Sequence, residues 1–540
     1  MSDGLFAALW PLDTSRPAVA EREFLRTGDG HRLTYTELHA ESARAAHALV
    51  ALGVRPGDRV AVQVDKSARA VVLYLAALRA GAVYLPLNTA YTDAELEYFL
   101  GDAEPALFVC TPGRRAALTP LLERLRLPAV ATLGGDSGAD GAGGDAAAHS
   151  GGAAAGSLPA AMAGMPARFA DVARVAADPA AILYTSGTTG RSKGALLSHG
   201  NLVCNARTLA ALWRFTPRDV LLHALPIFHI HGLFVAIHVT LAAGAALRFL
   251  PRFEPGLVLR HLPDCSVMMG VPTFYERLLR EAQLTPERVA GMRLFISGSA
   301  PLPVETHRAW RERTGHAILE RYGMSETGMN CSNPYEGERV PGSVGPPLPD
   351  VQLRVTDPAS GAPLPAESIG MIEVRGPNVF AGYWRAPDKT RATLRADGFF
   401  VTGDLGRIDA RGYVHIVGRA TDLIISGGYN VYPREIEDEI AALPGVLESA
   451  VIGLPSADWG EAVTAVVVPA AAGAAGATTN TAATAPAALS EADVIGALRT
   501  RLAAYKLPKR VLFAAELPRN VMGKVQKAQL RARYARLYNG

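Results

Sequence analysis

The sequence predicts an α/β fold with a large N-terminal domain and a small, mobile α+β C-terminal lid domain. In the large domain, mixed or parallel sheets are covered by helices. The first observation behind this prediction is that short apolar runs alternate with amphipathic stretches along the first four hundred residues, as in strand-helix repeats. The second is that the pattern changes after Gly418. We therefore expect domains at residues 1–417 and 418–540.

The large domain contains several apolar runs that predict strands. The first, RVAVQV at residues 59–64, precedes a helical pattern over residues 67–79. The later runs are AVYLPL (82–87), AILYTSG (181–187), DVLLHALP (219–226), SVMMGVP (266–272) and RLFISGS (293–299). In parallel α/β sheets, ligands bind beyond the carboxyl ends of the strands. The unusual segments TSGTTGRSKG, LPIFHIHGLF, VPTFYER and SGSAPL lie at these ends.

The C-terminal region has a shorter set of elements. We expect a helix over residues 435–443, strands over 449–453 and 463–468, and a helix near 491–503. A length of about 120 residues is ordinary for one domain. The segment from Gly418 to Asp422 is the expected hinge.

Two stretches interrupt these patterns. Residues 134–163 include nine Gly and eleven Ala, and residues 469–489 are rich in Ala and Thr. Neither has an apolar periodicity that could bury a face, so both are expected to be flexible insertions. Gly141, Gly143 and Ala146 match a dinucleotide-binding spacing, but no strand precedes them and the match is attributed to chance.

Composition indicates an ordinary globular protein. Of the 540 residues, 49% are hydrophobic and 19% charged, and the formal net charge is +3. The four cysteines, Cys110, Cys204, Cys265 and Cys331, are dispersed, which favours a reducing compartment. The N-terminus lacks the pattern of a secretory signal, and no run of about 20 apolar residues occurs. We expect a cytoplasmic protein without membrane insertion.

The last forty residues are basic. They contain ten Lys and Arg residues and one acidic residue, Glu516. A nucleic-acid patch is one interpretation of this charge, but little aromatic interleaving accompanies it. A polyanionic cofactor explains the same charge, so no nucleic-acid partner is expected.

The sharpest motif is YTSGTTGRSKG at residues 184–194. Three glycines allow close backbone approach, five Ser or Thr hydroxyls offer hydrogen bonds, and Lys193 adds a cation. These features predict a phosphate-binding loop. The spacing is not that of the common G-x-x-x-x-G-K-[ST] loop. A flexible Gly/Ser turn is the plainer alternative.

Further motifs follow in a fixed order: YGMSET at 322–327, TGD at 402–404, Gly418-Arg419 with Asp422, and PRNVMGK at 518–524. Together with the phosphate loop they resemble the adenylate-forming superfamily of acyl-CoA synthetases, firefly luciferase and nonribosomal-peptide adenylation domains. The resemblance covers nearly the whole chain. Within the superfamily, RYGMSETGMNCSNPYEGERVPGSVGPPLP, GGYNVYPREIE, LPIFHIHGLF and VPTFYERLL are similar to the malonyl-CoA synthetase group.

The resemblance implies that ATP, Mg²⁺ and CoA are used. It implies catalytic roles for Lys524, Glu326 and Lys193. Mg²⁺ would bind Glu326 together with Thr185. The residues implied in ATP or AMP binding are Thr185, Ser186, Gly187, Thr188, Thr189, Gly190, Ser299, Ala300, Tyr322, Gly323, Met324, Thr327, Asp404 and Arg419. Plainer alternatives are a solvated acid for Glu326, a turn for the TGD motif, an ion pair for Arg419 and a core aromatic for Tyr322.

The resemblance also implies a domain rotation. Lys524 would first stabilise the transition state of adenylation, in which a carboxylate attacks the α-phosphate. The small domain would then turn at Thr421, where the family commonly has Asp or Lys. The rotation brings Gly427, Gly428 and Tyr429 to the site for CoA.

A dicarboxylate substrate requires a partner for its second carboxylate. Arg277 is the expected partner, with Ser299 and His231 as weaker candidates, while Met324 limits pocket depth. The alternative for Arg277 is a surface arginine paired with Glu276 or Glu281. The predicted reaction converts malonate, ATP and CoA to malonyl-CoA, AMP and pyrophosphate, with methylmalonate as a secondary substrate.

Other functions stay open at this stage. A short- or medium-chain acyl-CoA synthetase is the first alternative, and an amino-acid adenylation module is a second. A non-catalytic nucleotide-binding relative would differ in class, but Lys193, Glu326, Asp404 and Lys524 all carry the expected residue type. We expect a monomer or homodimer whose partners are malonate, ATP and CoA.

Overall fold

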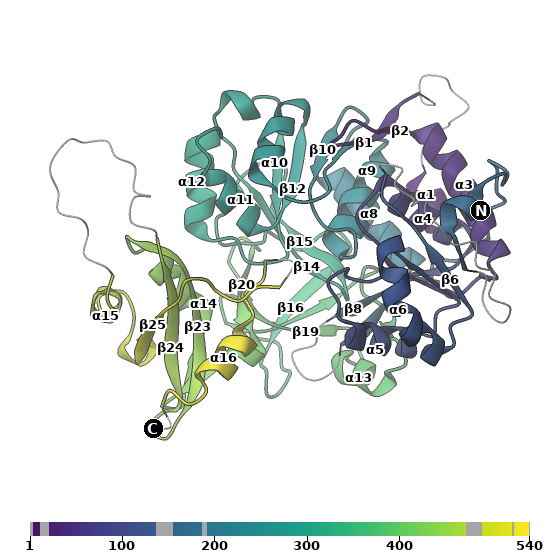
Figure 1. Ribbon diagram of the computed structural model, residues 1–540. Coiled ribbons are helices and arrows are strands. Elements are labelled where there is room, and N and C mark those ends of the chain that lie inside the picture. The colour runs from purple at the N-terminus through teal and green to yellow at the C-terminus, as the bar shows by residue number, and fades with distance from the viewer. Residues whose placement is uncertain are drawn as a thin grey trace.

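The computed structural model describes residues 4–10, 21–136, 155–185, 192–470, 489–520 and 523–538. A larger body and a smaller C-terminal body lie side by side in Figure 1. The larger body contains two eight-stranded sheets and one four-stranded sheet, and the smaller body contains a five-stranded sheet, all counted over the described residues. This arrangement confirms the predicted fold class.

The first large sheet is mixed, with a parallel centre and antiparallel edges. Its strands, in order across the sheet, are β15 (Gly328–Ser332), β14 (Leu319–Met324), β13 (Leu294–Ser297), β12 (Val267–Gly270), β10 (Val220–His223), β11 (Ala246–Phe249), β1 (Glu23–Thr27) and β2 (Arg32–Thr34). The carboxyl ends of β12, β13 and β14 lie at one edge because these strands are parallel. The segments VPTFYER and SGSAPL follow two of these strands directly.

The second large sheet has the same mixed character. Its strands, in order, are β18 (Gly382–Tyr383), β9 (Lys193–Ser198), β8 (Pro179–Thr185), β4 (Val83–Pro86), β3 (Arg59–Gln63), β5 (Leu107–Cys110), β6 (Ala129–Thr132) and β7 (Ala155–Ser157). Antiparallel pairing of β8 with β9 sets Thr185 opposite Lys193, at the two ends of the predicted phosphate loop.

One antiparallel sheet and one mainly antiparallel sheet complete the described strands. The four-stranded sheet consists of β16 (Gln352–Thr356), β17 (Gly370–Arg375), β19 (Phe400–Ile408) and β20 (Val414–Arg419). The sheet of the smaller body consists of β22 (Tyr429–Val431), β21 (Ile424–Ser426), β24 (Gly460–Pro469) and β23 (Val446–Ser456), with β25 (Arg510–Phe513) parallel to β24.

Helices cover the sheets. In the larger body they are α1 (Leu5–Leu9), α3 (Tyr35–Ala51), α4 (Ala68–Arg79), α5 (Asp93–Ala103), α6 (Pro112–Leu125), α7 (Leu158–Met162), α8 (His199–Leu212), α9 (His238–Ala243), α10 (Pro255–His261), α11 (Pro272–Leu279), α12 (Val304–Thr314) and α13 (Pro387–Thr393). In the smaller body they are α14 (Pro433–Ala441), α15 (Glu491–Leu498) and α16 (Lys527–Tyr534). Single turns of 3₁₀ helix are η2 (Leu262–Asp264), η3 (Glu287–Val289), η4 (Ala420–Asp422) and η5 (Ala504–Lys506), and η1 (His231–Ile237) is a π-helix.

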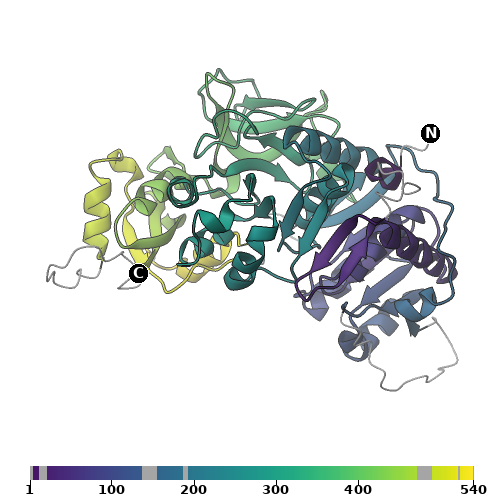
Figure 2. The same ribbon diagram turned by 90° about the horizontal axis from the view of Figure 1, so that it is seen from above.

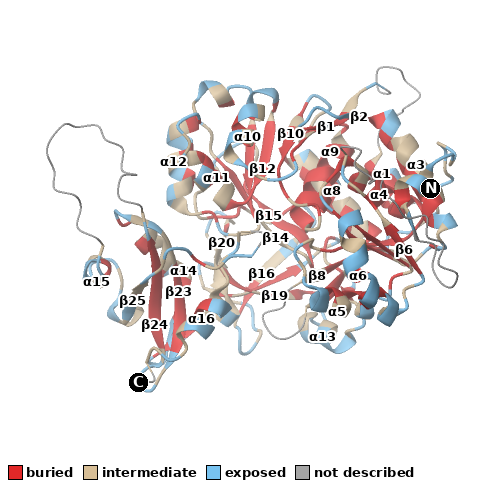
Figure 3. Ribbon diagram, in the orientation of Figure 1, coloured by how far each residue is buried: buried red, intermediate tan, exposed pale blue. Residues whose placement is uncertain are grey.

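The main hydrophobic core lies between the two large sheets. It joins buried residues of both sheets to α3, α4, α8 and η1, so these helices form the central layer. Helices α10 to α12 cover the outer face of the first sheet, and α5 and α6 cover that of the second. Figure 2 shows the layers from above, and Figure 3 shows the buried strands inside them. Local signals support these elements: Ser67, for example, caps α4 by accepting a hydrogen bond from the amide of Ala70 at 3.2 Å.

One sequence-based expectation is wrong in part. The insertion expected at residues 134–163 ends earlier, because residues 155–162 form β7 and α7 and β7 pairs in parallel with β6. Backbone hydrogen bonding to a sheet edge and burial of Leu158 give this segment structure despite its Gly and Ala content. Gly141, Gly143 and Ala146 lie outside the described residues, as does most of the insertion expected at 469–489. The domain boundary at residues 417 and 418 stays a prediction.

Candidate active site

An ion pair, Asp404 with Arg419, lies where the four-stranded sheet meets the first large sheet. The two residues are opposite each other on β19 and β20, and Arg419 Nε lies 2.8 Å from Asp404 Oδ1. Tyr322, at the end of β14, donates a hydrogen bond from its hydroxyl to Asp404 Oδ2. Burial raises the pKa of Tyr322 well above its usual value, and the charge of Asp404 adds to the rise. The sequence predicted these three residues, and the structure brings them together.

A second cluster surrounds Glu326, which is buried just after β14. The Tyr383 hydroxyl donates to Glu326 Oε1 at 3.0 Å, and the Thr185 hydroxyl lies 3.5 Å from the same oxygen. Burial raises the pKa of Glu326. Lys193 Nζ lies 5.1 Å from the centre of the Tyr383 ring. Oxygen atoms therefore surround the carboxylate, and a cation lies near it.

The predicted phosphate loop is described only at its ends. Ser186, Gly187, Thr188, Thr189 and Gly190 lie outside the described residues. The Thr185 hydroxyl lies 3.5 Å from the carbonyl oxygen of Lys193.

Lys524, in the smaller body, lies close enough to Asp404 and Arg419 for their charges to act on its ammonium group. The Lys524 residue is exposed, but partial desolvation by neighbouring atoms lowers its pKa, and the positive charge of Arg419 lowers it further. The charges of Asp404 and Asp422 act in the opposite direction. The loop is fixed by the Lys524 amide, which donates to Asn520 Oδ1 at 2.9 Å. Lys524 forms no ion pair with any residue in the described ranges.

The other basic residues near the C-terminus are largely paired with acids of the smaller body. The pairs are Arg501 with Glu439 (3.2 Å), Arg510 with Glu491 (3.0 Å), Lys527 with Glu437 (2.6 Å), Arg531 with Asp422 (2.9 Å), Lys506 with Glu435, and Arg519 with Glu448. The excess of positive charge in the last forty residues is therefore compensated locally by acids earlier in the chain. Lys524 is not among these paired residues.

The remaining predicted nucleotide residues lie at the ends of β13 and β14. Ser299 has a left-handed backbone, with φ of +73°, and Ala300 follows it. A Cβ on Gly323 would collide with the backbone of Gly328, so the turn tolerates only glycine there. Thr327 is buried, and its carbonyl oxygen accepts a hydrogen bond from Asn378. Met324 packs against the main core.

Sequence reasoning missed Arg321, the residue before Tyr322. Its side chain is 3% exposed, and Nε and one terminal nitrogen have no hydrogen-bond partner among the described residues. The guanidinium lies over Gly298, where a Cβ would overlap it. An arginine inside an otherwise buried strand segment, LERYG, was the available signal.

His231 and Ser299 lie close to Arg321. His231 Nδ1 is hydrogen-bonded to the Ser299 hydroxyl at 3.2 Å, and its Nε2 has no partner among the described residues. Burial lowers the pKa of His231 well below its usual value, and Arg321 adds to the effect. The imidazole is therefore neutral at pH 7.

Arg277 lies on an exposed face of α11, and its role as the partner of the second carboxylate stays a prediction. Its side chain is exposed on α11, and the guanidinium carbon lies 5.0 Å from the centre of the Phe253 ring. The buried face of α11 carries Tyr275 and Leu278. Arg277 follows Tyr275 by about 200° around the helix, so it projects from the opposite side.

The predicted hinge and CoA residues belong to the smaller body. Thr421 is exposed in η4, between β20 and β21. Gly427 and Gly428 have positive φ in the turn from β21 to β22, and the exposed Tyr429 stacks on Tyr505 with ring centres 4.8 Å apart. Among the described residues, no hydrogen bond or ion pair joins this turn to Asp404 or Glu326. In this structure, therefore, Lys524 is the predicted functional residue of the smaller body that lies near the larger body, and the turn from β21 to β22 is not.

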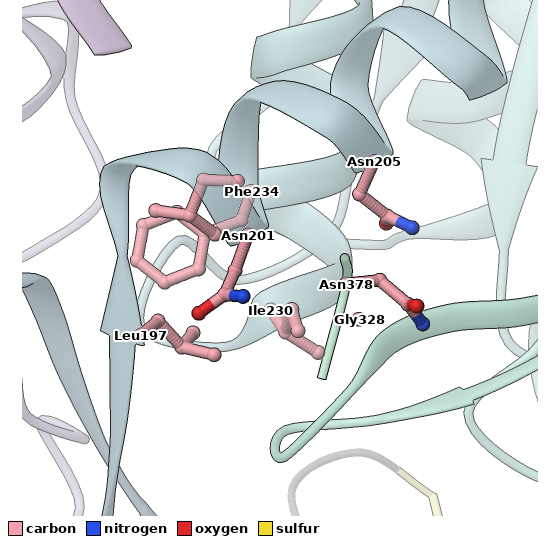
Figure 4. Close-up of a pocket in the computed structure, with 8 residues that line it drawn as sticks. Leu197, Asn201, Asn205, Ile230, Phe234, Gly328 and Asn378 are labelled. Atoms are coloured by element: carbon pink, nitrogen blue, oxygen red, sulfur yellow. The ribbon is translucent and has the colours of Figure 1, made fainter. Parts of the chain in front are cut away.

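A small cavity lies beside the site but is separate from it. Figure 4 shows its lining by Leu197, Asn201, Asn205, Ile230, Phe234, Gly328 and Asn378, and Leu202 also contributes. Its volume of about 10 Å³ is enough for about one water molecule. None of the predicted catalytic residues lines it, so it is not a substrate pocket. No helix among the described residues has the length and apolar character needed to cross a membrane.

The fold and these clusters are those of an adenylate-forming enzyme, and the chain belongs to the AMP-binding enzyme family. Residues 13–384 match this family, and residues 435–524 match the AMP-binding enzyme C-terminal domain. The chain is similar to the crystal structure of ATP-bound MatB from Rhodopseudomonas palustris. The identity is 54%, all of both chains is covered, and the TM-score is 0.90.

Curated relatives are more distant. The mitochondrial malonate–CoA ligase ACSF3 of Mus musculus is 36% identical, over 95% of this chain and 88% of the relative. A feruloyl-CoA synthase of Amycolatopsis sp is 34% identical, over 97% and 98%. The names of these relatives therefore describe enzymes that join an acid to CoA, but the acid that is named differs.

Proposed function

We propose that the protein is an AMP-forming ligase that joins malonate to CoA, with methylmalonate as a secondary substrate. A malonate carboxylate oxygen attacks the α-phosphorus of ATP, and pyrophosphate leaves. The CoA thiol, losing its proton, then attacks the acyl carbon and AMP leaves. The observation that supports this function best is the position of Lys524 beside Asp404 and Arg419. The similarity to MatB and to ACSF3 supports malonate as the acid.

Asp404, Arg419 and Tyr322 form the proposed nucleoside site. An ionised carboxylate has only acceptor atoms, so Asp404 suits both ribose hydroxyls, while Arg419 holds the carboxylate in place. Tyr322 would stack on adenine while its hydroxyl stays bonded to Asp404. Ser299 and Ala300 would form the floor between adenine and the acyl group.

Glu326 and Thr185 fit a magnesium ion bound to the ATP phosphates. Mg²⁺ prefers oxygen ligands, and the Glu326 carboxylate has the hydroxyls of Tyr383 and Thr185 as neighbours. A bound magnesium ion would neutralise charge on the phosphates. Lys193 and the loop from Ser186 to Gly190 would hold the phosphate oxygens.

Lys524 would stabilise the charge that develops between the attacking carboxylate and the phosphate. An ammonium fixed before the reaction favours the transition state over the ground state, because charge concentrates there only during attack. Rotation at Thr421 would then remove Lys524 and bring Gly427, Gly428 and Tyr429 to the site, opening a path for the CoA thiol.

A panel of carboxylic acids tests this function. Malonate, methylmalonate, propionate, butyrate, octanoate and ferulate are each incubated with ATP, Mg²⁺ and CoA, and products are identified by mass. We expect malonyl-CoA to form with the highest kcat/KM, followed by methylmalonyl-CoA. A clear preference for octanoate or ferulate would contradict the malonate assignment and leave the ligase class intact. ATP binding without pyrophosphate release for any acid would contradict the ligase class.

The proposal includes a cytoplasmic location. All four cysteines are free thiols in the structure, as a reducing compartment favours. Fractionation of cells expressing the full chain tests this part. The oligomeric state, monomer or homodimer, is open to sedimentation analysis.

A further inference from the structure

Arg434 joins the two bodies of the protein. It lies in the first turn of α14 in the smaller body, and its Nη2 donates a hydrogen bond to the carbonyl oxygen of Leu302 in the larger body at 3.3 Å. Of the hydrogen bonds between described residues, this is the one that connects the chain from β21 onward to the larger body. Arg434 Nε lies 2.9 Å from Asp438 Oδ1, one turn later in the same helix. Asp438 therefore restrains the guanidinium whose other end reaches Leu302.

The Leu302 peptide is itself fixed from inside the larger body. Its amide donates a hydrogen bond to Glu320 Oε1 at 2.9 Å, and both residues are buried. Burial raises the pKa of Glu320 to about 7, and the positive charge of Arg434 acts against this rise. A carboxylate at the amide and a guanidinium at the carbonyl polarise a peptide in the same sense. Arg434 therefore contacts a carbonyl whose direction the larger body sets.

Glu276 on α11 brings negative charge to the same boundary. Burial raises the pKa of Glu276, and Arg519 and Arg434 of the smaller body act against this rise. Two other groups act on it as well: Glu448 of the smaller body raises the pKa, and Arg280 at the end of α11 lowers it. Arg519 is paired with Glu448 within the smaller body. Cations of the smaller body therefore lie close enough to Glu276 for attraction across the boundary.

A contact at Arg434 also restrains the segment that carries Lys524. Glu437 lies on the same helix as Arg434, and its carboxylate is 2.6 Å from Lys527 Nζ. Lys527 begins α16, three residues after Lys524. The Glu437 carboxylate also accepts a hydrogen bond from the amide of Val451 on β23 at 2.8 Å, which ties α14 to the sheet. An anchor at the start of α14 therefore bears on the position of Lys524.

We propose that Arg434 is a positioning residue, which holds the smaller body in the orientation for adenylation by its hydrogen bond to the Leu302 carbonyl. This inference rests on the proposed function, because it assigns the contact to one of the two half-reactions. Rotation at Thr421 moves α14 away from Leu302, so the bond exists in only one of the two orientations. A contact made in one of two states shifts their populations by the free energy of that contact. Arg434 therefore favours the orientation that presents Lys524 over the one that admits CoA.

The test measures the two half-reactions separately. A single turnover with malonate, ATP and Mg²⁺ but no CoA gives the rate constant of pyrophosphate release and the malonate and ATP concentrations at half of it. For Arg434→Gln we expect this rate constant to fall about tenfold, because a hydrogen bond from a charged donor is lost. The half-saturating concentrations should change less than about twofold, since Arg434 contacts neither substrate. Formation of malonyl-CoA from supplied malonyl-adenylate and CoA should not fall.

Two further variants and a control separate positioning from folding. Arg434→Lys should recover most of the rate of pyrophosphate release, because one carbonyl needs a single donor and not a planar fork. Glu276→Gln should slow pyrophosphate release by a smaller factor and spare thioester formation, since it removes only the attraction across the boundary. Arg501→Gln is the matched control, because Arg501 pairs with Glu439 of α14 inside the smaller body. It should leave both half-reactions unchanged, and every variant should keep the wild-type Tm within a few degrees.

Three outcomes overturn the inference. They are equal losses in the two half-reactions for both Arg434→Gln and Glu276→Gln, unchanged pyrophosphate release in Arg434→Gln, or the same selective loss in Arg501→Gln. A wild-type protein that releases no pyrophosphate with malonate contradicts the proposed function instead, and this result is seen before any variant is compared.

Discussion

Gly523 of the smaller body lies against Thr273 of α11 in the larger body. A Cβ on Gly523 would be 2.9 Å from Thr273 Oγ1, closer than real Cβ contacts. Gly523 also has φ of +74°, which an L side chain rarely adopts. Because Lys524 follows directly, we expect this contact to influence the position of the lysine.

The Gly523→Ala variant should slow adenylation selectively. The added methyl group and the strained φ displace Lys524, and a displacement of about 1 Å can cost about 100-fold in rate. We expect at least a tenfold loss, about 1.4 kcal/mol, in pyrophosphate release. Thioester formation from supplied malonyl-adenylate should be nearly unchanged. Gly445→Ala is the control, since Gly445 has φ of +81° and open space around it. If Gly445→Ala slows pyrophosphate release as much as Gly523→Ala does, the effect comes from backbone strain alone.

Lys524→Ala should abolish adenylation and spare the second half-reaction. The ammonium acts on charge that develops during attack on phosphorus, and its removal should cost at least about 100-fold. Supplied malonyl-adenylate and CoA should still yield substantial malonyl-CoA, measured by mass. If both half-reactions fail together while Tm is preserved, Lys524 has a structural role instead.

The pH dependence of adenylation should reveal the lowered pKa of Lys524. The lysine must be protonated to stabilise the transition state, so the rate should fall as pH rises through its pKa. Partial desolvation and the charge of Arg419 lower that pKa, and the alkaline limb should therefore lie below the usual 10.5. The measurement is kcat/KM for pyrophosphate release without CoA, which excludes thiol titration. In Lys524→Arg the limb should disappear, since guanidinium stays charged. An unchanged limb in this variant would assign it to another group.

Tyr383→Phe should weaken the response to magnesium. The change removes the hydroxyl that donates to Glu326 at 3.0 Å and keeps the ring near Lys193. A lost hydrogen bond to a carboxylate costs about 1.5–3 kcal/mol, so the Mg²⁺ concentration for half-maximal rate should rise about tenfold or more. Tyr413→Phe is the matched control, because its hydroxyl contacts only the Glu338 carbonyl in the described residues. A uniform fall in rate without a shift in Mg²⁺ dependence would contradict this role for Tyr383.

Much of the fold follows from local patterns. The runs at residues 59–64 and 293–299 coincide with β3 and β13, and the predicted helix at 435–443 overlaps α14. The Gly- and Ala-rich composition of residues 155–162 gave the wrong expectation, because β7 is stabilised by pairing with β6 and not by its own sequence. Strand pairing depends on residues that are distant in the sequence, so the composition of one segment does not predict it.

The sequence by itself determined the family and the reaction class, and it predicted the residues of the proposed nucleotide site, because these lie in contiguous motifs whose residue types match their chemistry. Asp404, Arg419 and Glu326 were all found in this way. The tertiary structure decided the direction and the burial of individual side chains. It turned Arg277 outward on α11 and enclosed Arg321 between Gly298 and His231. Helix phase, cross-strand register and desolvation fix these outcomes, and each arises only when distant segments pack together.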